Sequence, residues 1–135
     1  MYEVFDHTAD LGLRVRAADI ETLFAEAARA LYSTIVDLSH VQPQQRETFR
    51  IEGRDRDYLL FDWLNELLFT FETKHLVLSE FQVQLHDGGL IAEAVGEPLD
   101  PQRHRLEHEV KAITYHGLVV KEEEDGWLAE VIVDI

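Results

Sequence analysis

Asp6-His7-Thr8-Ala9-Asp10 is the stretch around which the rest of this chain is organised, because it places two carboxylates and an imidazole between two apolar runs. Its far partner is Asp134-Ile135, where an aspartate stands beside the terminal carboxylate. If the fold brings the first and last strands together, several anionic oxygen groups converge. Such groups repel one another unless a cation, a proton or a basic side chain compensates, and hard oxygen donors favour Ca²⁺ or Mg²⁺. The residues therefore favour an oxygen-ligated divalent cation site that joins the two ends.

A plainer interpretation of the same residues stays open. Asp is a common turn residue between strands, where its side chain bonds to nearby backbone. An aspartate at the end of a chain is usually solvated and binds nothing. On this interpretation the first stretch is an ordinary turn and Asp134 is a surface carboxylate.

The composition is that of a globular protein without cysteine. With 135 residues and a hydrophobic fraction of 46%, we expect one domain, residues 1–135, with its own hydrophobic core. The absence of cysteine excludes disulfides, thiolate metal sites and cysteine nucleophiles, and it suits a reducing compartment. No signal-like segment and no run of ~20 apolar residues is present, so we expect a cytoplasmic protein without a membrane span.

The charge balance is strongly acidic and bears on the choice of partner. The formal net charge is −15. A chain this acidic repels nucleic-acid phosphates and anionic lipids over most of its surface. We therefore expect no direct binding to nucleic acid; in an RNA pathway, such a protein would act through a basic protein partner.

Two segments have the apolar spacing of amphipathic helices. Behind Asp19, a natural N-cap, apolar residues recur at helical spacing from residue 20 to residue 36. A second stripe runs from residue 59 to residue 71, and Phe61 and Phe69 add apolar residues on its flanks. We therefore expect the second helix to be covered on more than one side.

Alternating apolar and polar residues predict the strands. They fall at 2–5, 11–17, 47–52, 77–86, 90–95, 110–116 with 118–121 after an interruption at Gly117, and 127–133, with a hairpin turn at 87–89. The pattern predicts an α+β fold: a two-layer sandwich with two long amphipathic helices packed on a mostly antiparallel or mixed sheet of six to eight strands.

Two further groups of residues carry possible chemistry. His104 and His108 have the i, i+4 spacing of zinc ligands on a helix, although Pro98 and Pro101 favour a polar loop there. Lys111 falls on a strand face that is otherwise apolar and aromatic, and a lysine there needs an anionic neighbour. That neighbour could be a phosphate, a partner's carboxylate or an acid of this chain.

Three segments together make the sequence resemble the archease family. The first is 6–12, the second is 96–104 with 109–117, and the third is 126–135, while 63–68 in the second helix also fits. The likeness runs from the first residues to the last, and it implies an archease-like α+β domain.

The resemblance implies a function that composition and periodicity do not reveal. Archeases are protein cofactors of the RtcB-type RNA ligase, which joins tRNA halves during tRNA splicing after a ligase histidine is guanylylated. The archease promotes that guanylylation, allows multiple turnover and broadens nucleotide use. We therefore expect a non-catalytic activator of such a ligase, without independent enzymatic activity.

The resemblance also assigns roles to individual residues. The family's metal site matches Asp10, Asp134 and Ile135, with calcium the usual ion and magnesium possible. Lys111 matches a family lysine that acts with the acidic cluster on the ligase.

The resemblance gives weaker roles to three other residues. Asp6 stands where relatives often carry Glu, which places it behind the ligands or facing the partner. His7 and His116 are expected to line the site.

Two alternatives to ligase activation stay open. The first is a free-standing metal-dependent hydrolase that uses Asp10, Asp134 and His7, which requires an open coordination position and a pocket. The second is a general chaperone or adaptor without a metal role. Turnover by the isolated protein would favour the first, and metal-independent binding to many partners would favour the second.

Overall fold

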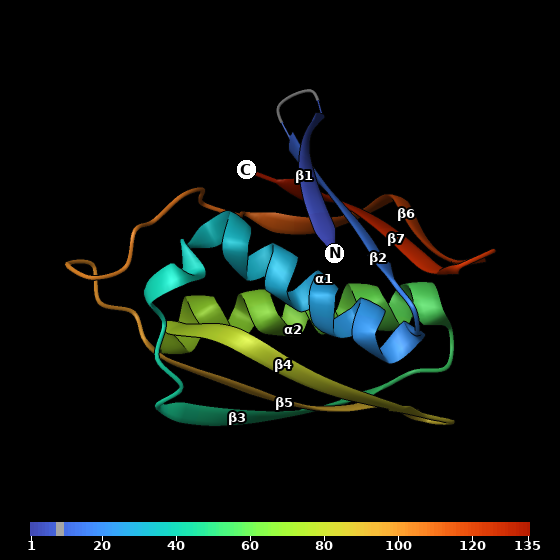
Figure 1. Ribbon diagram of the computed structural model, residues 1–135, viewed down its shortest axis with the longest axis horizontal. Helices are drawn as coiled ribbons and strands as arrows, with labels where there is room; N and C mark the ends of the chain where they lie inside the picture. The colour runs from blue at the N-terminus through green and yellow to red at the C-terminus, as the bar shows by residue number, and fades with distance from the viewer. Residues whose placement is uncertain (8–9) are drawn as a thin grey trace.

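Two helices lie between two antiparallel sheets in the computed structural model, which describes residues 1–7 and 10–135 (Figure 1). One sheet has the strand order β1-β2-β7-β6, and the other has the order β3-β5-β4. The elements are β1 (Tyr2–His7), β2 (Asp10–Ala17), α1 (Ile20–Ile35), a 3₁₀ turn (Leu38–His40), β3 (Gln45–Glu52), α2 (Arg56–Lys74), β4 (Leu76–His86), β5 (Gly89–Pro98), β6 (Ala112–Glu123) and β7 (Gly126–Asp134).

The α+β class, the two helices and the antiparallel strands agree with the sequence prediction. The arrangement in layers differs, because the strands divide between two sheets and the helices fill the space between them. Helix α1 packs against β2 and β4, and α2 packs against β6 and β3, so each helix contacts both sheets. The apolar residues on more than one side of α2 require this double cover.

The helix ends follow from local sequence. The Asp19 carboxylate accepts a hydrogen bond from the Thr22 backbone N–H at 2.8 Å, which satisfies a free donor at the start of α1. Helix α2 ends at His75, whose left-handed backbone (φ 54°) stops the helix. The indole N–H of Trp63, fully buried, donates to the Phe24 carbonyl at 3.0 Å and ties the two helices together. Neither helix contains a stretch long and apolar enough to cross a membrane.

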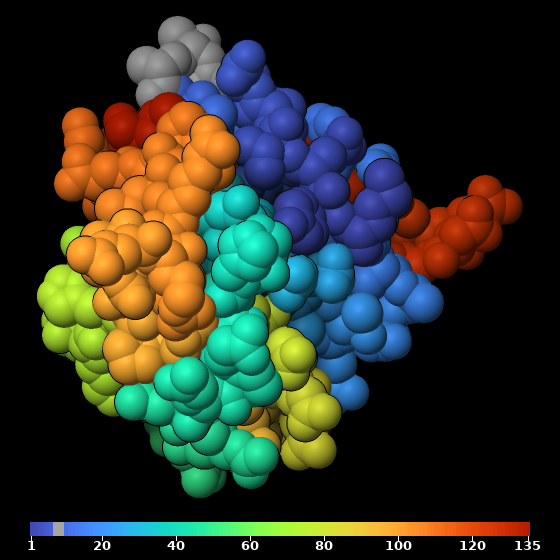
Figure 2. Space-filling model, turned by 60° about the vertical axis from the view of Figure 1, so that its left-hand side comes forward, coloured from blue at the N-terminus to red at the C-terminus, as the bar shows by residue number. Residues whose placement is uncertain are grey.

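The segment between β5 and β6, residues 99–111, has no regular structure but is held by backbone hydrogen bonds. The Asp37 N–H donates to the Arg105 carbonyl, and the His108 N–H donates to the Thr34 carbonyl. Figure 2 shows this segment, in orange, on the surface beside the cyan end of α1, with the dark red C-terminus nearby. The segment therefore brings Lys111 to the start of β6 in a defined position.

The zinc alternative for His104 and His108 does not fit this segment. His104 is buried, its Nε2 lies 3.0 Å from a Glu97 carboxylate oxygen, and its Nδ1 accepts from the Asp100 N–H at 2.8 Å. Both ring nitrogens are therefore occupied, and the chain here forms turns, not a helix. His108 is exposed, and its backbone N–H binds to α1.

Candidate functional site

Asp10 and Asp134 lie directly opposite each other at one end of the four-stranded sheet. Strand β2 pairs with β7 in a register that matches Asp10 with Asp134 and Leu11 with Val133. Directly opposed side chains share a face, and their Cβ atoms are ~5 Å apart. Leu11 and Val133 are buried toward the helices, so the two carboxylates lie on the outer face, and both residues are half-buried. The folded chain thus joins its first stretch to its end.

The same face carries a second cross-strand pair, in which the two side chains have opposite charges. Arg14 lies opposite Glu130, and its guanidinium is 3.2 Å from the Glu130 carboxylate. The Asp10–Asp134 pair has like charges instead, and among the described side chains no Lys, Arg or His forms an ion pair with either carboxylate. Like charges opposite each other destabilise a sheet unless a cation lies between them.

Gly12 shapes the sheet surface beside this pair. It lies opposite Phe5 in the β1–β2 register, and the Phe5 ring occupies the space where a Cβ at position 12 would point. The glycine therefore allows an aromatic ring to lie flat on the outer face, next to the end of the sheet that holds Asp10.

Lys111 enters the site through its backbone. Its N–H donates to the Asp134 carbonyl at 2.7 Å, and the next residue, Ala112, pairs with Asp134 in the β6–β7 register. Lys111 is exposed, so its ammonium group is free to move in solvent within reach of the strand ends. Segments from β2, β7 and the start of β6 therefore meet at one place.

The donor set at this place suits a hard divalent cation. Two carboxylates face each other, and a main-chain oxygen of Ile135 follows Asp134 by one residue. Carboxylate and main-chain oxygens are the donors that Ca²⁺ and Mg²⁺ take in proteins. Among the described side chains, which do not include that of His7, no three His, Asp or Glu residues converge to form a larger cluster. Asp10, Asp134 and Ile135 could hold a cation together with water or a partner's oxygen.

The other predicted residues take different positions. Asp6 lies opposite Leu11, which places it on the other face of the β1–β2 ladder from Asp10. His7 pairs with Asp10 in backbone register, but its side chain, like Thr8 and Ala9, lies outside the described residues. His116 is exposed within an irregular stretch of β6, four residues beyond Ala112 and ~13 Å along the strand.

A buried ionic network around Glu97, at the end of β5, was not predicted from the sequence. Glu97 is 1% exposed, and its carboxylate binds the Arg103 guanidinium, the Gln42 N–H at 2.7 Å and His104. Arg103, followed by the Gln42 N–H and His104, lowers the pKa of Glu97 to about 2, against the opposing effect of burial. The network fixes the segment that leads to Lys111. The signal available in the sequence was an acidic residue flanked by Gly96 and Pro98 at the end of an apolar strand.

Comparisons with known proteins place this chain among close relatives. Residues 2–135 match the Archease protein family (MTH1598/TM1083). "Protein archease" of Methanopyrus kandleri is 41% identical over 138 residues, covering 99% of each chain, and that of Pyrococcus abyssi is 37% identical over 139 residues, covering 99% of this chain and 98% of its own. The solution structure of Methanobacterium thermoautotrophicum protein 1598 matches with a TM-score of 0.89 at 36% identity, covering 99% of this chain and 98% of that one.

Proposed function

The chain belongs to the archease family, and on this premise we propose that it is a non-catalytic activator of an RtcB-type RNA ligase in tRNA splicing. In this role it promotes guanylylation of the ligase histidine, allows multiple turnover and broadens nucleotide use. The observation that carries the proposal is the match over residues 2–135, because it includes every segment that contributes to the Asp10–Asp134 end of the sheet.

Electrostatics gives a physical reason for the pairing of the two proteins. A ligase that binds nucleotide and RNA needs a basic surface, and a protein with a net charge of −15 is attracted to such a surface. Long-range attraction of this kind mainly raises the rate of association. It also weakens as salt screens the charges beyond ~10 Å at 0.1 M.

The Asp10–Asp134 end of the sheet is the part of the protein that we assign to the ligase active site. Asp10, Asp134 and Ile135 would hold a divalent cation there, most readily Ca²⁺, which supplies positive charge between the two carboxylates and holds the strand ends in place. Lys111 adds a mobile ammonium group at the same edge, suited to a phosphate or to a carboxylate of the ligase. The carboxylates themselves order basic or metal-bound groups of the ligase around its nucleotide.

The test is a multiple-turnover ligation assay with the cognate ligase, GTP, Mn²⁺ and RNA ends bearing 2′,3′-cyclic phosphate and 5′-hydroxyl groups. We expect the ligase alone to stop near one product per enzyme molecule and to continue when this protein is added. Asp134→Asn should remove that gain, and Glu124→Gln, at the far end of the β6–β7 hairpin, should retain it. If the wild-type protein produces no additional turnovers, the proposal is wrong.

A further inference from the structure

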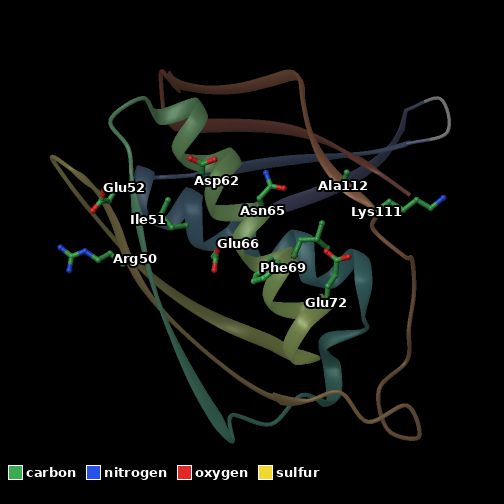
Figure 3. A pocket seen from close by; sticks show the side chains of 11 residues that line it. Arg50, Ile51, Glu52, Asp62, Asn65, Glu66, Phe69, Glu72, Lys111 and Ala112 are labelled. Atoms are coloured by element: carbon green, nitrogen blue, oxygen red, sulfur yellow. The ribbon is translucent and has the colours of Figure 1, made fainter.

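A groove of about 760 Å³ runs along the outward side of α2, between β3 and the start of β6 (Figure 3). One wall is β3 at Arg50, Ile51 and Glu52, and the floor is the α2 surface. Lys111 and Ala112 line the groove at the start of β6. Figure 3 shows the α2 side chains in a row along the groove, while the Lys111 side chain extends away from them toward the strand ends.

This side of α2 exposes aromatic rings that the fold leaves uncovered. Phe69 is 59% exposed, although the sequence pattern predicts cover at this position, and Tyr58 is 55% exposed. The two lie eleven residues apart, ~16 Å along the same helix face. Tyr115 of β6 is 41% exposed and stacks on Tyr58 with 4.7 Å between ring centroids. Clustered exposed aromatic side chains are typical of protein-binding surfaces.

The groove is also acidic. Its charged lining residues are four acids and two bases: Glu52, Asp62, Glu66, Glu72, Arg50 and Lys111. Among the described residues, none of these four carboxylates forms an ion pair with a basic side chain of this protein. At Tyr115, partial burial raises the phenol pKa most, followed by the neighbouring Tyr58 and then by the carboxylates of Asp57 and Asp55.

Carboxylates beside aromatic faces select for one kind of occupant. Arginine and lysine side chains pair with carboxylates through their charged ends, pack their apolar stems on aromatic rings and bind to ring faces through cation–π contacts. Nucleic acid is the wrong match, because its phosphates would meet four carboxylates. We propose that the α2 groove, with Tyr58, Phe69 and Tyr115, is the docking surface for a basic polypeptide segment of the protein partner.

The groove is continuous with the Asp10–Asp134 end of the sheet. Lys111 and Ala112 line the groove, and both bind to the Asp134 backbone, through a hydrogen bond and through the β6–β7 register. A segment bound along α2 therefore ends at the same sheet edge as Asp134, whose carboxylate lies on the outer face of that edge. Identification of the partner as the ligase rests on the function proposed above. The preference of the groove for a basic segment rests only on the residues that line it.

The test compares groove variants with matched controls in binding to the cognate ligase. The groove variants are Phe69→Ser and the double change Asp62→Lys with Glu66→Lys, all at exposed positions. The controls are Ile91→Ser, an exposed apolar residue of β5, and Glu124→Lys in the β6–β7 turn. Binding is measured by calorimetry or surface plasmon resonance, and guanylylation is measured as a function of the concentration of this protein.

We expect both groove variants to weaken ligase binding by roughly tenfold or more, as for central interface residues. The guanylylation rate at saturating concentration should stay at the wild-type value, because the carboxylate pair is intact. The charge reversal should also reduce the salt dependence of the association rate. The controls should bind like the wild type.

The outcomes separate the two proposals. If the groove variants bind the ligase like the wild type, the docking surface is wrong even when activation is confirmed. If the wild type binds the ligase through the groove without raising guanylylation, the proposed function is wrong and the docking surface holds. If the wild type does not bind the ligase, or if groove variants lose affinity for tRNA instead, the docking proposal is overturned.

Discussion

Two acidic centres of this protein, Glu97 and the Asp10–Asp134 pair, show opposite solutions to the same electrostatic problem. Glu97 is fully buried, and its charge is compensated by Arg103, His104 and a backbone N–H of the chain itself. The carboxylates of Asp10 and Asp134 are half-buried, face each other and have no basic partner among the described side chains. A carboxylate with internal partners stabilises the fold, whereas an uncompensated pair is available to a cation or to another protein.

The largest effect on stability is expected at Glu97. Glu97→Ala leaves the guanidinium of Arg103, the buried ring of His104 and the Gln42 N–H without their shared acceptor. We expect the free energy of unfolding in urea to fall by about 3 kcal/mol. A loss below about 1 kcal/mol would show that the network does not hold residues 99–111 in place.

The second effect is a metal-dependent gain at the Asp10–Asp134 pair. A ligand that binds only the folded state stabilises it by about 2.7 kcal/mol at one hundred times its Kd. We expect Ca²⁺ to raise the melting temperature of the wild type, with EDTA reversing the rise. Asp10→Asn should melt at or slightly above the metal-free wild type, because a like-charge repulsion is removed, and it should not respond to Ca²⁺. An equal Ca²⁺ response in both proteins would place the binding site elsewhere.

The third effect is a pH dependence of stability at Glu97. Its pKa is about 2 in the folded protein, below the ordinary value of 4.5, so the unfolded chain takes up the proton first. The stabilisation is therefore complete above pH 4.5 and is lost as the pH falls toward 2. The difference in unfolding free energy between wild type and Glu97→Gln should be constant from pH 7 to 5 and shrink between pH 4.5 and 2. A difference that stays constant down to pH 2 would contradict the lowered pKa.

The smallest effect is expected at Asp6. A substitution there tests whether the second face of the β1–β2 ladder contributes to the site. Asp6 lies opposite Leu11, away from the face that holds Asp10. Asp6→Asn should therefore change ligase guanylylation by less than roughly twofold, whereas Asp10→Asn should abolish the stimulation. Equal loss in both variants would mean that the outer face alone does not define the site.

The sequence predicted the helices and strands, whose apolar residues recur at regular spacing. The apolar stripes give both helices, alternation gives the strands, and the α+β class follows. The division into two sheets was not predicted, because apolar residues on several sides of α2 indicate that it is covered but do not show how the covering strands are divided between sheets. The strand predicted to contain Lys111 begins one residue later, because β6 starts at Ala112, and Lys111 lies exposed at the end of the preceding irregular segment.

The candidate site was predictable where it depends on residue type and strand order. We expected Asp10 and Asp134 to come together if the fold joins the first and last strands. The pairing of β2 with β7 places the two residues opposite each other. The Glu97 network was missed because a buried, internally compensated acid resembles a surface acid in sequence. The groove along α2 was missed because the pattern predicted cover where Phe69 is exposed.

The measurement that tests the central claim most directly is the single-turnover rate of ligase guanylylation with GTP and Mn²⁺, in the presence of the wild type or of Asp10→Asn. Circular dichroism and urea unfolding would first establish that both proteins are folded. Acceleration by the wild type and none by Asp10→Asn is the predicted result, and it assigns ligase activation to the Asp10–Asp134 pair. Equal acceleration by both proteins would contradict that assignment, and no acceleration by either would remove the proposed function itself.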